Sequence, residues 1–165
     1  MDPELLNKSI TDKIGKSLIT SKQTIAVAES VTAGHLQACL SLADKALDFF
    51  QGGITAYNIG QKTKHLGVNP IHALATNCVS EKIAGEMAKN VALVFNSDWG
   101  IGITGYASPV PEKNIEELFA CFAITLHQQI IILETVTAVK QSPLNARLFY
   151  SKVVLEKLLA ALQQR

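Results

Sequence analysis

Apolar residues recur along the chain at two spacings: the four-residue spacing of helices, and the short unbroken runs of buried strands. A first helix is expected to begin at Pro3 with Asp2 as its cap, because proline is favoured at the first helical position. Its buried face follows from apolar residues four positions apart: Leu6, Ile10, Ile14 and Leu18. A first strand is predicted at residues 24–28, and a second helix from about Val31 to Leu42.

The middle of the chain continues this alternation of strands and helices. Strands are expected at residues 52–57 and 99–104, with short helices at 59–66 and 70–76 between them. A longer helix follows the capping residue Ser80. The buried stripe of that helix is predicted to be Ile83, Met87, Val91 and Val94.

The last third of the chain changes to a hairpin and a final helix. Two β-rich runs, 118–126 and 130–139, are joined by a hairpin signal at 127–129. Pro143 begins the final helix, and four residues are expected to point inward: Leu155, Leu158, Leu159 and Leu162. Early alternation followed by a hairpin predicts an α/β fold, in which a mixed sheet carries helices on both faces. No linker is visible, so residues 1–165 are expected to form a single domain.

Composition supports a packed domain and excludes several classes of protein. The 165 residues are 48% hydrophobic and carry a net charge of only +1, so the basic surface typical of nucleic-acid binding is missing. No apolar run approaches the ~18 residues that a membrane span needs, and the N-terminus lacks the features of a signal peptide. We therefore expect a cytoplasmic protein that binds neither nucleic acid nor membrane.

Cysteine and histidine spacing argues against disulfides and metal sites. Cys39, Cys78 and Cys121 lie far apart and form no CxxC motif, so three buried thiols are expected. The histidines show no spacing typical of metal ligands. Neither a metal nor another cofactor is predicted.

Ser30 stands where the first strand turns toward the second helix. Its side chain is expected to point past the end of the sheet, beside the free N–H groups that open a helix. Because those groups favour negative charge, Ser30 suits either a nucleophile or an anion-binding cap. A serine nucleophile needs a base, and Lys62 would serve if burial lowered its pKa, with Tyr57 relaying the proton or holding the lysine.

Motifs that follow one another along nearly the whole chain resemble the CinA C-terminal domain family. Residues 28–34, Ala-Glu-Ser-Val-Thr-Ala-Gly, resemble the family signature Ala-Glu-Ser-Cys-Thr-Gly-Gly. Residues 53–68 carry Tyr57, Lys62 and Leu-Gly-Val in the register of Gly-x-x-x-Tyr-Ser-Asn-Glu-Ala-Lys…Leu-Gly-Val. Residues 79–81 resemble its Val-Ser-Glu, and residues 104–109, Thr-Gly-Tyr-Ala-Ser-Pro, resemble Thr-Gly-Ile-Ala-Gly-Pro.

The resemblance implies a fold and an activity, since bacterial members of this family are nicotinamide-nucleotide amidases. The implied fold is a three-layer α/β/α sandwich with a mixed, mostly parallel sheet. The implied reaction converts nicotinamide mononucleotide to nicotinic acid mononucleotide and ammonia, with no cofactor. Carried over by position, Ser30 would be the nucleophile, and Lys62 with Tyr57 would activate it. The N–H groups near Val31 and Thr32 would stabilise the oxyanion.

The resemblance also implies residues that bind the substrate, a small nucleotide. They are Thr32, Gly34, Thr104, Gly105 and Arg147. Thr104 and Gly105 close the third strand, and ligands of open α/β sheets bind at such strand ends. Family members commonly self-associate, so a homo-oligomer, most simply a dimer, is expected.

One loop departs from the family pattern. The usual Gly-Pro-Gly-Gly-Gly stretch is replaced within residues 108–117, which contain two prolines and no glycine, although Glu112 and Lys113 keep the family's Glu-Lys. Glycines allow N–H groups to approach a phosphate, whereas prolines remove N–H donors. Glu116 and Glu117 would repel a phosphate if they faced the cleft. The family's His-Gly is replaced by Thr76 and Asn77.

Two hypotheses about function follow from these observations. The first is an active amidase, because Ser30, Tyr57 and Lys62 are all present. The alternative is a catalytically silent relative that keeps the fold for binding or assembly, because the phosphate loop is changed.

The signature at residues 28–34 also differs from the family's at position 33. Alanine in place of the family's glycine there is expected to be a small change within a helix.

Overall fold

The computed structural model describes residues 3–165, with side chains from Lys8 onward. Its helices and strands are α1 (Pro3–Ser21), β1 (Ile25–Glu29), α2 (His35–Ser41), β2 (Phe50–Thr55), α3 (Ile59–Leu66), α4 (Pro70–Ala75), α5 (Glu81–Val94), β3 (Trp99–Gly105), β4 (Leu118–Leu126), β5 (Gln129–Ala138) and α6 (Pro143–Gln163). The predicted start at Pro3 is confirmed, whereas its expected cap, Asp2, lies outside the described residues.

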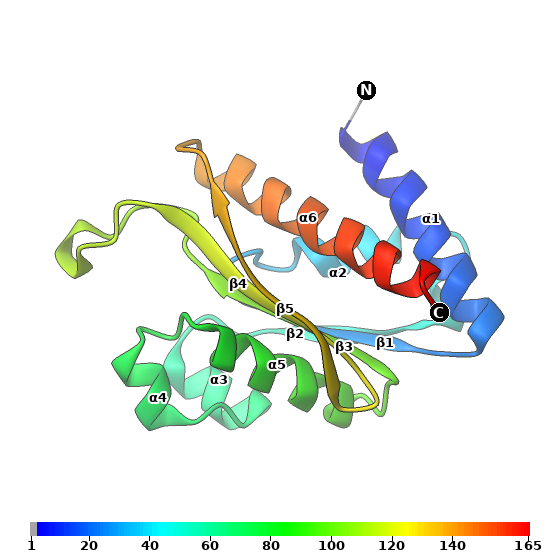
Figure 1. The fold of residues 1–165 in the computed structure, drawn as a ribbon, viewed down its shortest axis with the longest axis horizontal. Coiled ribbons are helices and arrows are strands. Elements are labelled where there is room, and N and C mark those ends of the chain that lie inside the picture. The colour runs from blue at the N-terminus through cyan, green and yellow to red at the C-terminus, as the bar shows by residue number, and fades with distance from the viewer. Residues whose placement is uncertain (1–2) are drawn as a thin grey trace.

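A five-stranded mixed sheet forms the middle layer, in the order β2-β1-β3-β4-β5. The strand β1 pairs parallel with β2 and β3, and the β3–β4 and β4–β5 pairs are antiparallel. Four strands therefore point the same way and β4 is reversed. Helices α1, α2 and α6 cover one face, and α3, α4 and α5 cover the other (Figure 1). The expected α/β architecture with helices on both faces is confirmed.

The larger core lies between the sheet and the layer of α1, α2 and α6. The predicted inward residues Ile14, Leu18, Leu155 and Leu158 are fully buried. Each such side chain contributes about 1.5–3 kcal/mol of stability by leaving water. The α5 stripe is confirmed at Ile83, Met87 and Val91.

Val94 is a wrong prediction for the buried stripe of α5, because it is 59% exposed. Four-residue spacing from Val91 leads to Phe95, the residue at the end of the helix, and Phe95 packs against the core instead. The helix ends before the stripe is complete, so the last contact comes from its capping residue.

Helix α5 lies unusually close to β3 because the strand presents glycines to it. A methyl group on Gly100 would lie 2.1 Å from the carbonyl oxygen of Ala88, and one on Gly102 would lie 2.2 Å from that of Ala84. Both alanines are fully buried. Small residues on both elements therefore bring the helix backbone onto the strand.

The second helix begins at His35, four residues later than predicted from the apolar pattern. The reason is Glu29, the last residue of β1, whose side chain is fully buried. Its carboxylate accepts the N–H groups of Leu36 (3.0 Å) and Gln37 (2.8 Å) in the first turn of α2. A buried carboxylate at the positive end of a helix is favourable, and here it sets where the helix starts.

Residues 30–34 are therefore a turn rather than the first turn of a helix. Ala33 has φ +51° and Gly34 has φ +95°, both in the left-handed region. The expectation that alanine at position 33 is a small change within a helix is wrong, because Ala33 lies outside the helix. A left-handed conformation costs a residue with a Cβ roughly 1–2 kcal/mol.

The hairpin prediction is confirmed, with β4 matching its expected bounds and β5 beginning one residue early. The turn residues His127 and Gln128 both have positive φ, +47° and +67°, as tight hairpin turns require. The strand β2 begins at Phe50 rather than residue 52, because Phe50 already pairs with Ile25 of β1.

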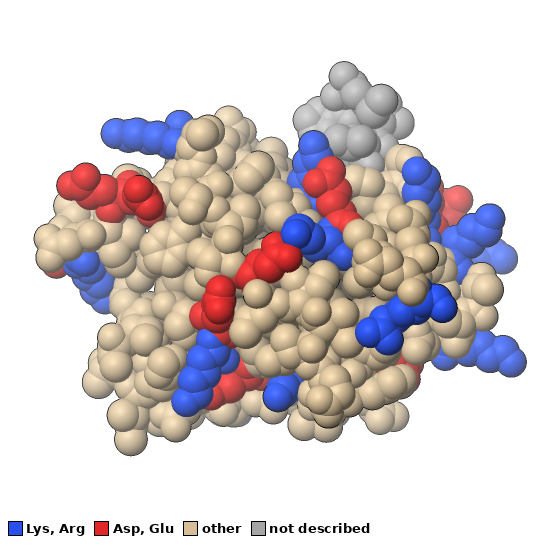
Figure 2. All heavy atoms as spheres, viewed as in Figure 1, with Lys and Arg blue, Asp and Glu red and all other residues tan. Residues whose placement is uncertain are grey.

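The surface carries mixed charge on the face drawn in Figure 2. Lys and Arg side chains alternate there with Asp and Glu among the described residues, and they form no continuous basic area. Within residues 3–165, no helix has both the length and the apolar character needed to cross a membrane.

Candidate functional site

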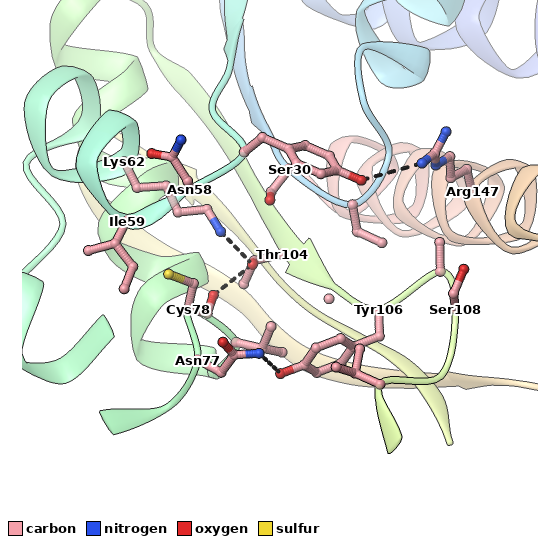
Figure 3. Close-up of a pocket in the computed structure, with 16 residues that line it drawn as sticks. Ser30, Asn58, Ile59, Lys62, Asn77, Cys78, Thr104, Tyr106, Ser108 and Arg147 are labelled. Atoms are coloured by element: carbon pink, nitrogen blue, oxygen red, sulfur yellow. Dashed lines mark hydrogen bonds between the residues drawn. The ribbon is translucent and has the colours of Figure 1, made fainter. Parts of the chain in front are cut away.

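A pocket of about 390 Å³ opens at the carboxyl ends of β1 and β3. After β1 the chain continues to β2, which lies on one side of β1 in the sheet, and it later returns to β3 on the other side of β1. The strand order therefore reverses at β1. Ligands of open α/β sheets bind at such a point. Figure 3 shows Ser30, Lys62, Thr104 and Arg147 around this pocket.

Lys62 lies in the floor of the pocket and is only 2% exposed. Its Nζ donates a hydrogen bond to Thr104 Oγ1 at 3.2 Å. Thr104 Oγ1 in turn donates to the carbonyl oxygen of Cys78 at 2.7 Å. The single proton of the threonine hydroxyl is thus committed to Cys78, so Thr104 can only accept from the lysine.

Burial lowers the pKa of Lys62 below its ordinary value, because the charged ammonium is deprived of water. No Asp or Glu lines the pocket among the described residues, so no carboxylate offsets that effect. A neutral amine also carries N–H donors, so Thr104 can accept a hydrogen bond from Lys62 in either protonation state. The surroundings of Lys62 therefore favour the neutral amine, which is the form that can act as a base.

Ser30 follows β1 directly and is 6% exposed. Its backbone N–H donates to the carbonyl oxygen of Ile103 at 3.1 Å, which ties the residue to β3. Its hydroxyl lines the pocket and forms no hydrogen bond with any residue that the structure describes, Lys62 included. The hydroxyl and the lysine amine thus share one pocket without a direct bond.

The turn after Ser30 is held from below by the Glu29 carboxylate. This carboxylate accepts the Thr32 hydroxyl at 2.5 Å and the Gly34 N–H at 3.1 Å, in addition to the two N–H groups of α2. The resemblance implies that Thr32 and Gly34 bind substrate. In the structure, the Thr32 hydroxyl and the Gly34 N–H donate to Glu29 instead, and neither residue lines the pocket. The N–H groups of Val31 and Thr32 donate to no acceptor in residues 3–165.

Tyr57 and Arg147 lie together at the mouth of the pocket. Arg147 comes from α6, and its Nη2 donates to the Tyr57 hydroxyl at 3.4 Å. The Arg147 Nε is buried without a hydrogen-bond partner in the described protein. Tyr57 is 64% exposed and forms no bond to Lys62. Thr104 therefore holds the lysine, and of the two roles considered for Tyr57, relaying the proton or holding the lysine, the second falls to Thr104.

The loop that replaces the family's glycine-rich stretch forms a small finger. Val110 and Ile115 pair across it, and its tip is the short turn Pro111–Lys113. Glu116 and Glu117 border hollows elsewhere and do not line the pocket. The repulsion of a phosphate that these carboxylates would cause inside the cleft therefore does not arise.

Two neighbouring residues of the site, Asn77 and Cys78, were not foreseen. Both have left-handed backbones, with φ of +50° and +63°, and this bend aims the Cys78 carbonyl at Thr104. Asparagine tolerates that conformation, so Asn77 was a detectable turn signal. Cys78 carried no such signal, because its contribution is a backbone carbonyl.

The cysteines and histidines offer no further chemistry at the site. Cys39, Cys78 and Cys121 are buried free thiols, as predicted. Burial raises the pKa of the Cys39 thiol to about 11, so it stays protonated at neutral pH. Within the described part of the chain, no three His, Cys, Asp or Glu side chains are grouped to hold a metal ion.

The fold and motifs match a known family. The family model of the CinA C-terminal domain matches residues 7–161. A CinA-like protein of Picosynechococcus sp. is 41% identical over 111 residues, which are 67% of this chain and 26% of the relative. The match thus spans about a quarter of that relative.

Solved structures agree with this match over almost the whole chain. The crystal structure of a competence-damaged protein (CinA) superfamily protein from Enterobacter cloacae is 26% identical, with a TM-score of 0.86 over 94% of this chain and 92% of that one. A competence or damage-inducible protein from Enterobacter asburiae is also 26% identical, with a TM-score of 0.86 over 94% and 98%. The chain belongs to the CinA C-terminal domain family.

Proposed function

We propose that this chain is an amidohydrolase that converts nicotinamide mononucleotide to nicotinic acid mononucleotide and ammonia, with Ser30 as nucleophile and Lys62 as base. The observation that carries the proposal is the state of Lys62. Its amine is buried, has no carboxylate partner among the described residues, and donates to a threonine oxygen that can accept from it in either protonation state. A purely structural lysine would gain more from an acidic partner or from solvent.

The proposed reaction begins when Ser30 Oγ bonds to the amide carbon and its proton passes to Lys62 Nζ. The resulting oxyanion lies near the N–H group of Val31, which lines the pocket and donates to no other acceptor in residues 3–165. The C–N bond then breaks as Lys62 returns the proton to the leaving nitrogen, and ammonia departs. Water, deprotonated by Lys62, cleaves the acyl ester and restores Ser30.

The charge of the pocket supports an anionic substrate. Lys62 and Arg147 bring two basic groups to its lining, and no acidic side chain of the described residues lines it. Arg147, with a buried and unpaired Nε, would bind an oxygen of the substrate at the mouth. Gly105 ends β3 at the edge of the pocket, and a Cβ there would lie 2.4 Å from the Phe119 carbonyl oxygen, so the glycine lets β4 pack closely beside Thr104.

The test is ammonia release from nicotinamide mononucleotide by the wild type and by Ser30→Ala. The proposal expects a loss of at least about 10³-fold in kcat for the variant, because the covalent route is removed. Ser108→Ala is the matched control, since Ser108 also lines the pocket and has no proposed role in the chemistry. Equal rates in the wild type and Ser30→Ala would refute the assignment of Ser30.

A second candidate function is a silent relative that binds a nucleotide without turnover. The observation that favours it is the missing Ser30–Lys62 hydrogen bond, together with the prolines Pro109 and Pro111 in the finger. This candidate predicts that the wild type binds the mononucleotide and releases no ammonia. Measuring both the binding of the mononucleotide and the release of ammonia therefore separates the two functions.

A further inference from the structure

A chain of three polar side chains runs from the tip of the finger to the wall of the pocket. Lys113 Nζ donates to Asn77 Oδ1, and Asn77 Nδ2 donates to the Tyr106 hydroxyl at 2.9 Å. Asn77 and Tyr106 both line the pocket, whereas Lys113 does not. Figure 3 shows the Asn77–Tyr106 bond on the side of Thr104 away from Ser30.

The direction of every hydrogen bond in this chain follows from the chemistry of its first member. A lysine ammonium has donors and no acceptor, so the oxygen of the Asn77 amide must face Lys113. The NH₂ group of Asn77 then faces Tyr106, and the tyrosine oxygen must accept from it. The hydrogen of the Tyr106 hydroxyl is therefore left over, and it finds no acceptor in residues 3–165.

Tyr106 is held firmly in this position. Its carbonyl oxygen accepts the Tyr150 hydroxyl at 2.9 Å, and its ring packs edge-to-face on Phe119 with centroids 5.3 Å apart. The residue is only 8% exposed. Because the hydroxyl lines the pocket and has no acceptor in residues 3–165, its hydrogen is free to be donated to a ligand that enters the pocket.

We infer that Lys113, Asn77 and Tyr106 form a relay that binds the phosphate of the nucleotide, and that the relay replaces the family's glycine-rich loop; the inference rests on the proposed substrate. All donors in the relay point toward the pocket, so the positive charge of Lys113 polarises the chain and strengthens its last O–H as a donor. An anionic oxygen is the acceptor that such a donor favours most.

The position of the relay supports this assignment. Asn77 stands where the resembling pattern has glycine and Tyr106 where it has isoleucine, whereas Lys113 keeps the lysine of that pattern's Glu-Lys. Two departures and one retained lysine thus meet in one hydrogen-bonded chain. A phosphate there would lie on the opposite side of Thr104 from Ser30, which leaves the amide end of the nucleotide at the nucleophile.

The experiment measures equilibrium binding by calorimetry in the Ser30→Ala protein, which does not consume the ligand. The two probes are nicotinamide mononucleotide and nicotinamide riboside, which lacks the phosphate. Tyr106→Phe keeps the ring and removes the hydroxyl, and it should weaken binding of the mononucleotide about 10- to 100-fold, the value of a hydrogen bond to a charged group. Binding of the riboside should change by less than about twofold.

A double-variant comparison tests the relay itself. Lys113→Met should weaken binding of the mononucleotide about threefold to tenfold, and adding it to Tyr106→Phe should cause no further loss, because the charge acts through the tyrosine hydroxyl. Lys140→Met is the charge-matched control on an exposed lysine outside the pocket, and its binding should equal that of the parent.

Several results would overturn the relay. Equal weakening of both probes by Tyr106→Phe, unchanged binding of both, additive losses in the double variant, or no binding of the mononucleotide would each do so. The amidase proposal fails separately. Ammonia release with an unchanged KM in Tyr106→Phe, in a protein that retains Ser30, refutes the relay and keeps the amidase. Selective loss of mononucleotide binding in Tyr106→Phe, together with no ammonia release by the wild type, keeps the relay and refutes the amidase.

Discussion

At the residue scale, the site depends on one amine in an unfavourable place. Lys62 is buried with a threonine oxygen as its hydrogen-bond acceptor, and burial lowers its pKa. Its folded-state pKa lies below its unfolded-state value, so the folded protein binds fewer protons than the unfolded chain between the two values. The lysine therefore destabilises the fold at low pH, and this cost disappears as pH rises through the unfolded pKa.

The pH dependence of the rate should follow the same group. We expect kcat/KM to rise with pH and to level off below 10.5, the ordinary pKa of lysine, because the base works in its neutral form. Rates of ammonia release from about pH 6 to 10 test this. Lys64→Met, an exposed lysine on the same helix, should keep the profile, and a flat profile in the wild type would contradict a lysine base.

A second prediction at this scale concerns the turn after Ser30. Ala33 is exposed and has φ +51°, so Ala33→Gly should raise the free energy of unfolding by about 0.5–1 kcal/mol. Ala38→Gly is the matched control: Ala38 is an exposed alanine inside α2, where glycine should lower the free energy by about 1 kcal/mol. Denaturant unfolding measures both, and destabilisation by Ala33→Gly would contradict the left-handed turn.

At the scale of elements, two contacts place the turn after Ser30 and the surroundings of Lys62 relative to the sheet. The Glu29 carboxylate joins the end of β1 to the first turn of α2. The glycines of β3 let α5 approach, and the loop before α5 carries the Cys78 carbonyl that holds Thr104. The geometry at Lys62 thus depends on how closely a helix and a strand pack.

Close packing of α5 on β3 gives a prediction with an internal control. Gly102→Ala should lower the free energy of unfolding by about 3 kcal/mol, because the added methyl would meet the Ala84 carbonyl at 2.2 Å. Gly60→Ala in α3 meets only ordinary contacts, so it should be neutral or stabilise by up to about 1 kcal/mol. Similar effects of the two variants in thermal unfolding would show that the packing is looser than described.

At the scale of the whole molecule, the pocket is assembled from both helical layers and the sheet between them. Lys62 comes from α3 on one face, Arg147 from α6 on the other, and Thr104 from β3 in the middle. A ligand that contacts all three joins the layers. The self-association expected from the family resemblance stays a prediction.

A ligand that joins the layers should stabilise the fold as one unit. Nicotinamide mononucleotide at about 100 times its Kd should add roughly 2.7 kcal/mol, which corresponds to a rise in Tm of about 5–10 °C for a chain of this size. Thermal unfolding with and without the nucleotide measures the shift. Sodium chloride at matched ionic strength is the control, and an equal rise with salt alone would contradict specific binding.

Much of the fold was predictable from local patterns. The periods of apolar residues gave most strands and helices, with β4 and α3 at their expected bounds, because burial on one face leaves a repeat in the sequence. Helix α2 was misplaced because its start depends on the Glu29 carboxylate rather than on apolar spacing. Val94 was misplaced because the four-residue spacing from Val91 leads to Phe95 rather than to Val94.

The candidate site was predictable only in part, and the difference has a physical cause. The sequence by itself determined which groups the chain possesses: a serine at a strand end, a lysine and a tyrosine in family register, and a loop without glycine. Only the tertiary structure decided which of them meet. It set Thr104 rather than Tyr57 on Lys62, turned Thr32 toward Glu29, and joined Asn77 to Tyr106. Hydrogen bonds between residues far apart in the chain have no periodic trace in a sequence, because they form only when separate elements pack.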